Sequence, residues 1–378
     1  MKILINKIGG QAGGINRRVY EISNYINSHS GNELVVLSMG VKKKLDVKIN
    51  GNVKEYLLPN SKWENITPGK EKRGVPEQLR TIENFKKYVS DTTKQIENIL
   101  VNETPDVCFV QGAFYFPWCL VIAAYSEKVP IVQLYCGSTQ TEVFNPEFRH
   151  AYYRLEQYFA ELANITIFNS KKGKSFIEKT FARDYSGAPI IYNGFPAEYA
   201  KLNSVIPSQV TIGWCGRNST VKNMDYIFCL REYLSKDNYP MYLITSMAPD
   251  DPKLKKLAGH SIIMLNQFSP VQMIEFYKKV SCVLSTSHFE FFPNVIAEAI
   301  AAGRIPIVPK ESGIAELLIE NDLSELVYQL ESTEQVAHLI MRSNDFQARV
   351  SELSRKMVAN YSWEKVIERY LFEFKKLI

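Results

Sequence analysis

The chain has 378 residues, of which 46% are hydrophobic and 22% are charged, and these values exclude a disordered or low-complexity protein. The length exceeds one typical domain and fits two of roughly 190 residues. The formal net charge is +5, but no continuous basic stripe with interleaved aromatic residues is present, which argues against nucleic-acid binding.

Membrane spans and metal sites have no signature in the chain. No uncharged apolar run reaches the length of about 18 residues that a spanning helix needs. Residues 1–6 read as a short strand rather than a signal peptide, so we expect a cytoplasmic protein. The six cysteines occur singly, without C-x-x-C pairs or clustered histidines, so we expect no metal.

The first half alternates short β-rich runs with longer helical runs, which is typical of a parallel α/β sheet. A helix is predicted over residues 16–27, and no clear element is predicted for the polar stretch from about 40 to 75. The predicted strands cover residues 2–6, 33–38, 106–111, 130–135, 165–169 and 190–192.

A glycine-rich loop follows the first strand. Its glycines form two pairs around Gln11 and Ala12, and the second pair, Gly13 and Gly14, precedes the helix. Missing side chains let a phosphate or sugar approach the backbone near a helix start. The spacing does not spell G-x-G-x-x-G, so the loop lacks the fingerprint of a nicotinamide or flavin site.

The second half repeats the α/β alternation, with turn residues at 193–196 as the boundary. We therefore predict two similar α/β domains. Ligands of such sheets bind at the carboxyl ends of the strands, so a cleft between domains is the expected site. The predicted strands cover residues 210–215, 239–245, 262–265, 282–285 and 305–309.

Two basic residues follow the strand at 210–215. Arg217 and Lys222 would lie at its carboxyl end, before a helix. An arginine fork and a lysine point charge both suit phosphate oxygens, and each charge-assisted contact in a desolvated site contributes ~1.5 to 3 kcal/mol. They are candidates to stabilise a leaving diphosphate, although an isolated pair of this kind is more often a solvated surface feature.

Two glutamates, Glu290 and Glu298, are separated by seven residues around a Phe-Phe-Pro turn. Glu298 is the only polar residue from 295 to 302, as in a buried helix. Pro293 suits a helix start, which places Glu290 in the preceding loop beside a helix end that attracts anions. The alternative is a solvated helix whose glutamates pair with lysines.

These motifs together resemble family 4 of the retaining nucleotide-sugar glycosyltransferases, whose architecture is GT-B. The order of the glycine loop, the Arg217 and Lys222 pair, the E-x7-E block and Trp363 in the tail carries the resemblance over most of the chain. It implies two Rossmann-like domains facing each other across a cleft: an acceptor domain at 1–194 and a donor domain at 195–361. Residues 362–378 would form a helix that returns to the first domain, with Trp363 as an anchor.

The resemblance also implies roles for individual residues. Arg217 and Lys222 would hold the diphosphate, Glu298 the ribose and Glu290 the transferred sugar. The remaining donor contacts would come from the glycine loop and two further segments: Gly13, Gly14, Gln267, Phe268, Phe292, Pro293, Asn294 and Val295. Transfer would retain the anomeric configuration and need no metal or cofactor, with a UDP-sugar favoured as donor and a GDP-sugar as the alternative.

One segment departs from that family. Where many of its members carry a histidine, this chain has Cys136, followed by Gly137, Ser138 and Thr139 as candidate acceptor contacts. The departure leaves open a non-catalytic GT-B subunit that stabilises a partner enzyme or presents its substrate. A sugar-nucleotide epimerase is a third interpretation, less favoured because the first half has few pocket histidines and carboxylates.

The acceptor stays open among small molecules, glycans, lipids and proteins. Residues 1–195 carry 25 Lys and Arg against 19 Asp and Glu, whereas residues 196–378 carry 20 against 21. The first half is therefore the basic one, with Lys42 to Lys44 and Lys70 to Arg73 in its polar stretch. This excess would favour an acidic acceptor or peripheral contact with an anionic membrane.

Overall fold

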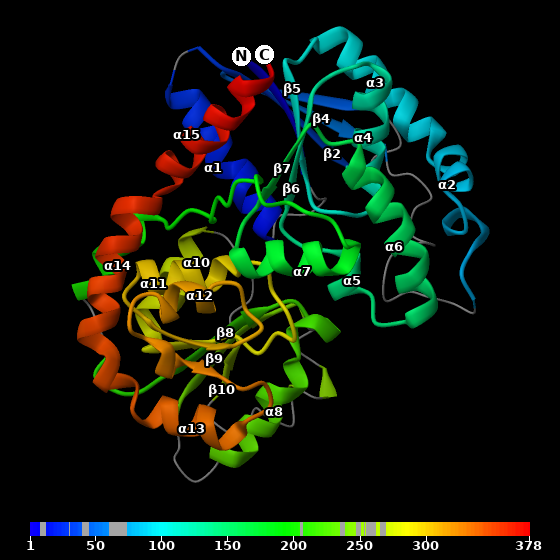
Figure 1. The fold of residues 1–378 in the computed structure, drawn as a ribbon. Helices are drawn as coiled ribbons and strands as arrows, with labels where there is room; N and C mark the ends of the chain where they lie inside the picture. The colour runs from blue at the N-terminus through cyan, green and yellow to red at the C-terminus, as the bar shows by residue number, and fades with distance from the viewer. Residues whose placement is uncertain are drawn as a thin grey trace. The chain divides into compact units, whose positions relative to one another are not determined.

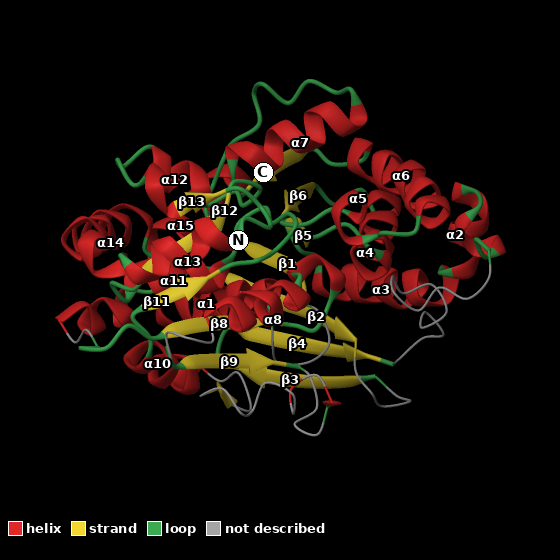
Figure 2. Cartoon of the chain, turned by 90° about the horizontal axis from the view of Figure 1, so that it is seen from below, coloured by secondary structure: helices red, strands yellow, loops and turns green. Residues whose placement is uncertain are grey.

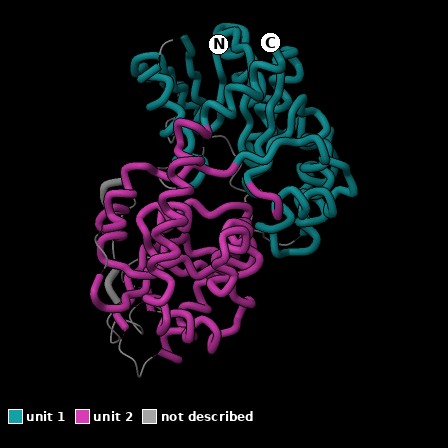
Figure 3. Tube along the Cα trace, turned by 60° about the vertical axis from the view of Figure 1, so that its left-hand side comes forward, with its two compact units in different colours: residues 1–169, 173–191, 367–378 teal, residues 170–172, 192–366 magenta. Residues whose placement is uncertain are grey.

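A computed structural model describes residues 1–7, 13–29, 31–39, 45–59, 74–204, 207–234, 239–246, 251–252, 254, 262–264 and 270–378. The chain divides into two compact units, coloured teal and magenta in Figure 3. The first unit contains residues 1–169, 173–191 and 367–378, and the second contains residues 170–172 and 192–366. Each unit contains one of the two main sheets, and Figure 1 labels many of their elements.

The sheet of the first unit has the order β3-β4-β2-β1-β5-β6-β7. Its strands run parallel except for β3, which pairs antiparallel with β4 at the edge. The strands are β1 (Lys2–Asn6), β2 (Glu33–Met39), β3 (Asp46–Asn50), β4 (Val53–Leu58), β5 (Val107–Gln111), β6 (Ile131–Tyr135) and β7 (Ile165–Phe168).

The strand predicted at 190–192 is wrong. Ile190 makes only an isolated bridge with Phe168, the last residue of β7. Two backbone hydrogen bonds surround this bridge, from Phe168 N to Pro189 O and from Ile191 N to Phe168 O. Because β7 ends there, its backbone offers no further partner, and the chain passes into the second unit at Tyr192.

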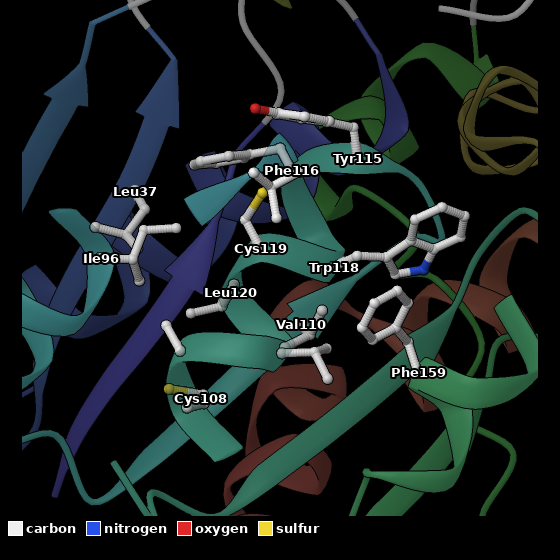
Figure 4. Packing of buried hydrophobic residues seen from close by; sticks show 14 of the residues in the cluster. Leu37, Ile96, Cys108, Val110, Tyr115, Phe116, Trp118, Cys119, Leu120 and Phe159 are labelled. Carbon is white, nitrogen blue, oxygen red and sulfur yellow. The ribbon is translucent and has the colours of Figure 1, made fainter. Parts of the chain in front are cut away.

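The side chains of β5 contribute to the core on both faces of this sheet, because successive side chains of a strand point to opposite sides. Cys108 and Val110 belong to the hydrophobic cluster of Figure 4, where Trp118 stacks on Phe159 at 5.4 Å between ring centroids. Phe109 points the other way and contacts Tyr370, with ring centroids 5.0 Å apart. The long helices of this unit, wholly or in part, are α1 (Gly14–Ser28), α3 (Ser90–Glu103), α4 (Tyr115–Ser126), α6 (Pro146–Glu161), α7 (Lys171–Phe181) and α15 (Trp363–Phe374); the short ones are α2 (Ile82–Tyr88) and α5 (Thr139–Glu142).

The second unit has a parallel sheet with the order β10-β9-β8-β11-β12-β13. Its strands are β8 (Ile212–Gly216), β9 (Met241–Thr245), β10 (Ile262–Met264), β11 (Cys282–Leu284), β12 (Ile305–Pro309) and β13 (Val327–Tyr328). Its helices, red in Figure 2, include α8 (Met224–Tyr233), α10 (Pro270–Lys279), α11 (Asn294–Ala301), α12 (Ala315–Ile319), α13 (Thr333–Met341) and α14 (Gln347–Tyr361).

The strand order of this sheet reverses direction between β8 and β11. Strands β9 and β10 extend to one side of β8, and β12 and β13 extend beyond β11 on the other side. The crevice at the carboxyl ends of two such strands is where open α/β sheets bind ligands. Within the described part of the chain, no helix combines the length and the apolar character needed to cross a bilayer.

Candidate functional site

The candidate site lies at this reversal point, where β8 and β11 are direct neighbours. Their register pairs Cys282 with Ile212 and Val283 with Gly213, so both strands end on the same edge of the sheet. The chain leaves β8 into Arg217 and a single 3-10 turn, η4 (Thr220–Lys222). It leaves β11 into the segment that ends at Glu290 and then enters α11.

Gly216 makes the exit from β8 tight. A Cβ atom at this position would lie 2.9 Å from Cη2 of Trp214 and 3.5 Å from Cδ of Lys222. Glycine therefore leaves room for the indole and the lysine stem to pass the backbone. Asn223 then ends η4 with φ of 47°, a left-handed conformation that asparagine tolerates better than most residues.

The predicted lysine and the first glutamate meet directly. Lys222 Nζ lies 2.8 Å from Glu290 Oε2, and the two side chains are only 23% and 16% exposed. The other carboxylate oxygen, Oε1, accepts a hydrogen bond from the Ser287 hydroxyl. The Glu290 backbone is also held, because its carbonyl accepts from Gly313 N at 2.8 Å. Glu290 is therefore oriented from both ends.

The second glutamate is buried, as its apolar context predicts. Glu298 is 7% exposed on α11, and its Oε2 accepts a hydrogen bond from the Tyr277 hydroxyl at 3.0 Å. Tyr277 is fully buried and also lies 2.9 Å from the Val295 carbonyl. Burial, and then the Glu298 charge, raise the pKa of Tyr277 well above its usual value, so the phenol keeps its proton as a donor.

Cys215 shows that these charges converge on the end of β8. Burial is the main cause that raises the pKa of this thiol. The charges of Glu298 and Glu290 raise the thiol pKa further, whereas the Lys222 charge lowers it. The three predicted residues thus act electrostatically on one atom, although they are separated by up to 76 positions in the chain.

The start of α11 is braced by Asn193. Its Nδ2 donates to the Phe292 carbonyl at 3.2 Å and to Asn294 Oδ1 at 2.5 Å. Phe292 and Pro293 are buried, whereas Asn294 and Val295 are half-buried. Pro293 occupies the position before the first helical residue. The backbone predicted to hold the sugar or phosphate is thus fixed before any ligand arrives.

Arg217 and the predicted base contacts are not among these linked residues. Arg217 is exposed after β8, and the structure gives it no ion pair with any residue that it describes. Gln267 and Phe268, the predicted base contacts, fall outside the described residues.

The candidate residues of the first unit lie at two other strand ends. Gly13 has φ of 126° and precedes α1, so it uses a conformation that favours glycine. Gly137 is half-buried after β6, whereas Ser138 and Thr139 are fully buried. Ser138 caps α5 by accepting from Gln140 N at 3.1 Å. The Ser138 hydroxyl therefore binds the backbone of its own loop, whereas the Thr139 hydroxyl donates to Glu156.

Glu156 of α6 binds that loop through Thr139, and this role was not predicted from the sequence. Its Oε2 accepts from the Thr139 amide at 3.0 Å and from the Thr139 hydroxyl. Burial raises the pKa of Glu156 to about 8, although the hydrogen bonds from Thr139 favour the ionised form. Its other oxygen, Oε1, is buried and has no hydrogen-bond partner among the described residues.

Sequence patterns also missed Ser287, Tyr277 and Asn193. Ser287 stands three residues before Glu290, so its proximity in the chain was an available signal. Tyr277 and Asn193 reach the site from distant segments. A glutamate in an apolar helix demands a buried donor, but the sequence does not identify which residue supplies it.

Part of the chain matches a known family model and a curated protein. Residues 215–360 match the family model described as glycosyl transferases group 1. A lipopolysaccharide 1,2-N-acetylglucosaminetransferase of Salmonella typhimurium is 30% identical over 124 residues, which cover 32% of this chain and 32% of that protein. The match therefore spans about a third of the curated relative's length.

Solved structures are similar over the whole chain. Sucrose-phosphate synthase from Thermosynechococcus elongatus has a TM-score of 0.73 at 14% identity, covering 100% of this chain and 98% of that one. A trehalose-6-phosphate structure from E. coli bound with UDP-2-fluoro glucose has a TM-score of 0.71 at 14% identity, covering 100% of both chains. A glycosyltransferase from Rickettsia africae has a TM-score of 0.66 at 16% identity, covering 100% and 98%.

At these identities the structural likeness concerns the fold, and it confirms the predicted architecture of two Rossmann-like parallel-sheet units, that of GT-B glycosyltransferases. The region matched by the family model contains Arg217, Lys222, Glu290 and Glu298. The family match and the fold together support a GT-B glycosyltransferase.

Proposed function

We propose that the chain is a metal-independent, retaining glycosyltransferase of family 4 that uses a nucleoside-diphosphate sugar. One observation carries the proposal: Lys222 and the glutamates 290 and 298 converge at the end of β8, inside the region matched by the family model. The names of similar proteins support the donor class. One is bound to UDP-2-fluoro glucose and another is named for N-acetylglucosamine transfer, so a UDP-hexose is favoured.

In this proposal, Lys222 and Arg217 stabilise the leaving group. Breaking the bond between the anomeric carbon and the β-phosphate oxygen leaves the electron pair, and one more negative charge, on the diphosphate. Cations that contact this charge bind the transition state more tightly than the ground state, which raises kcat. Lys222 is already oriented through Glu290, and exposed Arg217 is free to approach the phosphates.

Glu290 and Glu298 bind rather than cleave in this proposal. Glu298, held by Tyr277, accepts hydrogen bonds from the ribose hydroxyls. Glu290 accepts from hydroxyls of the transferred sugar, with Ser287 and Lys222 fixing its two oxygens. The diphosphate itself takes the acceptor's proton as the new glycosidic bond forms on the same face, so no protein base is required. Catalysis is then positional and electrostatic.

The test is donor consumption by the purified chain. UDP-glucose, UDP-N-acetylglucosamine and GDP-mannose are first ranked by thermal shift, and release of the nucleoside diphosphate is then measured for the best donor. Arg217→Ala and Lys222→Met should each lower kcat/KM tenfold or more, equivalent to about 1.4 kcal/mol at the transition state.

Matched controls for these variants lie in the same unit. Arg355→Ala on α14 and Lys279→Met on α10 remove exposed cations of the same types that do not lie at the carboxyl end of β8. Both controls should keep the wild-type rate. Unchanged kinetics in folded Arg217→Ala and Lys222→Met would reject the assigned roles.

The cysteine at position 136 favours a second candidate, a non-catalytic GT-B subunit that stabilises a partner or presents its substrate. Many members of the resembled family have a histidine at this point, whereas the pKa of the Cys136 thiol is raised by burial, so it stays neutral. Binding of a nucleotide sugar and copurification with a second transferase, without turnover by the chain alone, would support this candidate. Robust turnover by the single protein would remove it.

A further inference from the structure

We infer that Thr286 is a positioning residue for the leaving-group lysine. Its hydroxyl links the Trp214 indole to the backbone of Lys222 and holds that residue where the diphosphate would bind. The inference rests on the proposed function and adds two residues, Thr286 and Trp214, that no motif of the sequence singled out.

The direction of both hydrogen bonds is fixed by chemistry. Trp214 Nε1 lies 3.0 Å from Thr286 Oγ1, and an indole N–H can only donate. The threonine hydroxyl therefore accepts a hydrogen bond from the indole and donates its single proton to the Lys222 carbonyl, 2.7 Å away. Trp214 is 2% exposed and Thr286 is 0% exposed, so water does not replace either bond. The link is a buried, one-way chain of two hydrogen bonds.

A second bond ties the same turn to the same segment. His288 N donates to the Val221 carbonyl at 2.9 Å. Two consecutive carbonyls of η4, those of Val221 and Lys222, are thus held by the segment that follows β11. Lys222 is fixed at its backbone by Thr286 and at its ammonium by Glu290. Its long stem therefore has little freedom left, which is unusual for a lysine.

Removing the Thr286 hydroxyl should change the position of the Lys222 ammonium group. Losing the Thr286 hydroxyl would leave the Trp214 N–H and the Lys222 carbonyl buried and unpaired, so the turn would shift to satisfy them. A displacement of about 1 Å at a catalytic group can reduce a rate about a hundredfold. Nucleotide binding elsewhere, through Glu298 for example, would be unaffected. Loss of the Thr286 hydroxyl should therefore reduce the contribution of the β-phosphate to the affinity for the nucleotide.

The test compares a nucleoside diphosphate with its monophosphate. The ratio of the Kd for UMP to the Kd for UDP measures the β-phosphate contribution, and GMP with GDP replaces this pair if the wild type prefers guanosine. Thr286→Val keeps the side-chain shape but removes the hydroxyl. We expect its ratio to fall about tenfold, as for loss of one charge-assisted contact, and kcat to fall with it. Thr286→Ser, which restores a hydroxyl, should recover both.

Thr211→Val is the matched control. Thr211 Oγ1 also donates to a lysine carbonyl, that of Lys279, at 2.9 Å, but it lies at the opposite end of β8. This control should lose stability without any change in the ratio. If Thr286→Val does not fold, Trp214→Phe removes the indole donor together with part of the ring but leaves the Thr286 hydroxyl, and a fall of about threefold is expected.

The outcomes separate this inference from the proposed function. A wild-type ratio and kcat in Thr286→Val, or in Trp214→Phe if only that variant folds, would overturn the inference. An equal fall in Thr211→Val would also overturn it, because the effect would then be general destabilisation. A wild type that binds UDP and GDP no more tightly than UMP and GMP would instead overturn the diphosphate site itself.

Discussion

Glu298 of the apolar helix α11 accepts a hydrogen bond from the Tyr277 phenol. Tyr277→Phe removes the hydroxyl that reaches Glu298 Oε2 and the Val295 carbonyl while keeping the ring. The ribose contact should form equally in the ground and transition states, so we predict a KM for the donor about fivefold higher with kcat nearly unchanged. Steady-state kinetics with the preferred donor measure the split.

Tyr226→Phe on α8 is the control, because it removes a buried phenol hydroxyl from the same unit without touching Glu298. Equal changes in KM for the two variants would show that Tyr277 acts only through the stability of the unit. A fall in kcat alone would contradict a ground-state role for Glu298.

Glu156 makes stability depend on pH. Its pKa rises from 4.5 to about 8 in the folded protein, so between these values the folded state holds a proton that the unfolded state has lost. Unfolding then releases a proton, and stability falls as pH rises through the window, by up to about 1.4 kcal/mol per pH unit. Glu156→Gln cannot ionise and removes this contribution.

We therefore predict that Glu156→Gln gains about 2 kcal/mol relative to wild type between pH 5.5 and 7.5. Urea unfolding of both proteins at both pH values measures this gain. Glu147→Gln, an exposed change on the same helix, is the control. A gain as large in the control, or none in Glu156→Gln, would contradict a protonated Glu156.

A single residue of the site could be predicted from the sequence only where it departs from the pattern around it. Glu298 stands out because burying a charged side chain in an apolar helix costs free energy unless a partner pairs with it. Its distance from Glu290 along the chain suggested one site. In the structure, the charges of both glutamates raise the pKa of the buried Cys215 thiol. The partners Tyr277 and Thr286 could not be predicted, because ordinary core tyrosines and threonines look the same in a sequence.

At the scale of elements, the fully buried strands could be predicted from the sequence, whereas the exposed edge strand β3 could not. The fully buried run of β5 follows the apolar pattern that parallel strands require. In contrast, β3 is exposed along four of its five residues and pairs with β4 only. Its Asp46, Lys48 and Asn50 look like loop residues. Polar composition on an exposed edge therefore concealed β3, and the prediction also omitted its neighbour β4, which lies inside the sheet.

Gly194 shows how one helix start is fixed. A Cβ atom at this position would lie 2.3 Å from Cδ2 of Trp363 and 2.8 Å from its Cα, so the first residue of α15 packs directly on the glycine. Both residues belong to the second unit, so the role of Trp363 in anchoring a helix to the first domain stays a prediction. We predict that Gly194→Ala destabilises the protein by about 2 to 4 kcal/mol, as overpacking against backbone does.

Gly187→Ala offers the matched change, since a Cβ atom there meets nothing within 4 Å. It should alter the unfolding free energy by less than about 0.5 kcal/mol. Thermal and urea unfolding of the two variants test the contrast. Similar stability of both variants would mean that Trp363 does not approach Gly194 as closely as the structure has it.

At the scale of the whole molecule, sequence similarity and structural similarity cover different parts. The family model matches residues 215–360, whereas solved structures cover the whole chain at 12% to 16% identity. The matched region contains Arg217, Lys222, Glu290 and Glu298, whereas Gly13 and Gly14 of the first unit lie outside it. Under the proposed function, the second unit binds the donor and the first unit recognises the acceptor.

The stereochemical course is the last property that the proposal predicts. If the leaving diphosphate takes the acceptor's proton on the face it departs from, the configuration at the anomeric carbon is retained. Glu290 is the carboxylate nearest to the proposed sugar position, and both its oxygens are engaged by Lys222 and Ser287. This engagement argues against Glu290 as a nucleophile that attacks from the opposite face.

Water can replace the unknown acceptor in the test. During hydrolysis of UDP-α-glucose, or of the preferred α-linked donor, proton NMR should detect the α-anomer of the free sugar first, before mutarotation. The rate should be unchanged by EDTA, because Arg217 and Lys222 supply the positive charge at the diphosphate. First appearance of the β-anomer would contradict retention, and a rate lost in EDTA and restored by Mg²⁺ or Mn²⁺ would assign that charge to a metal instead.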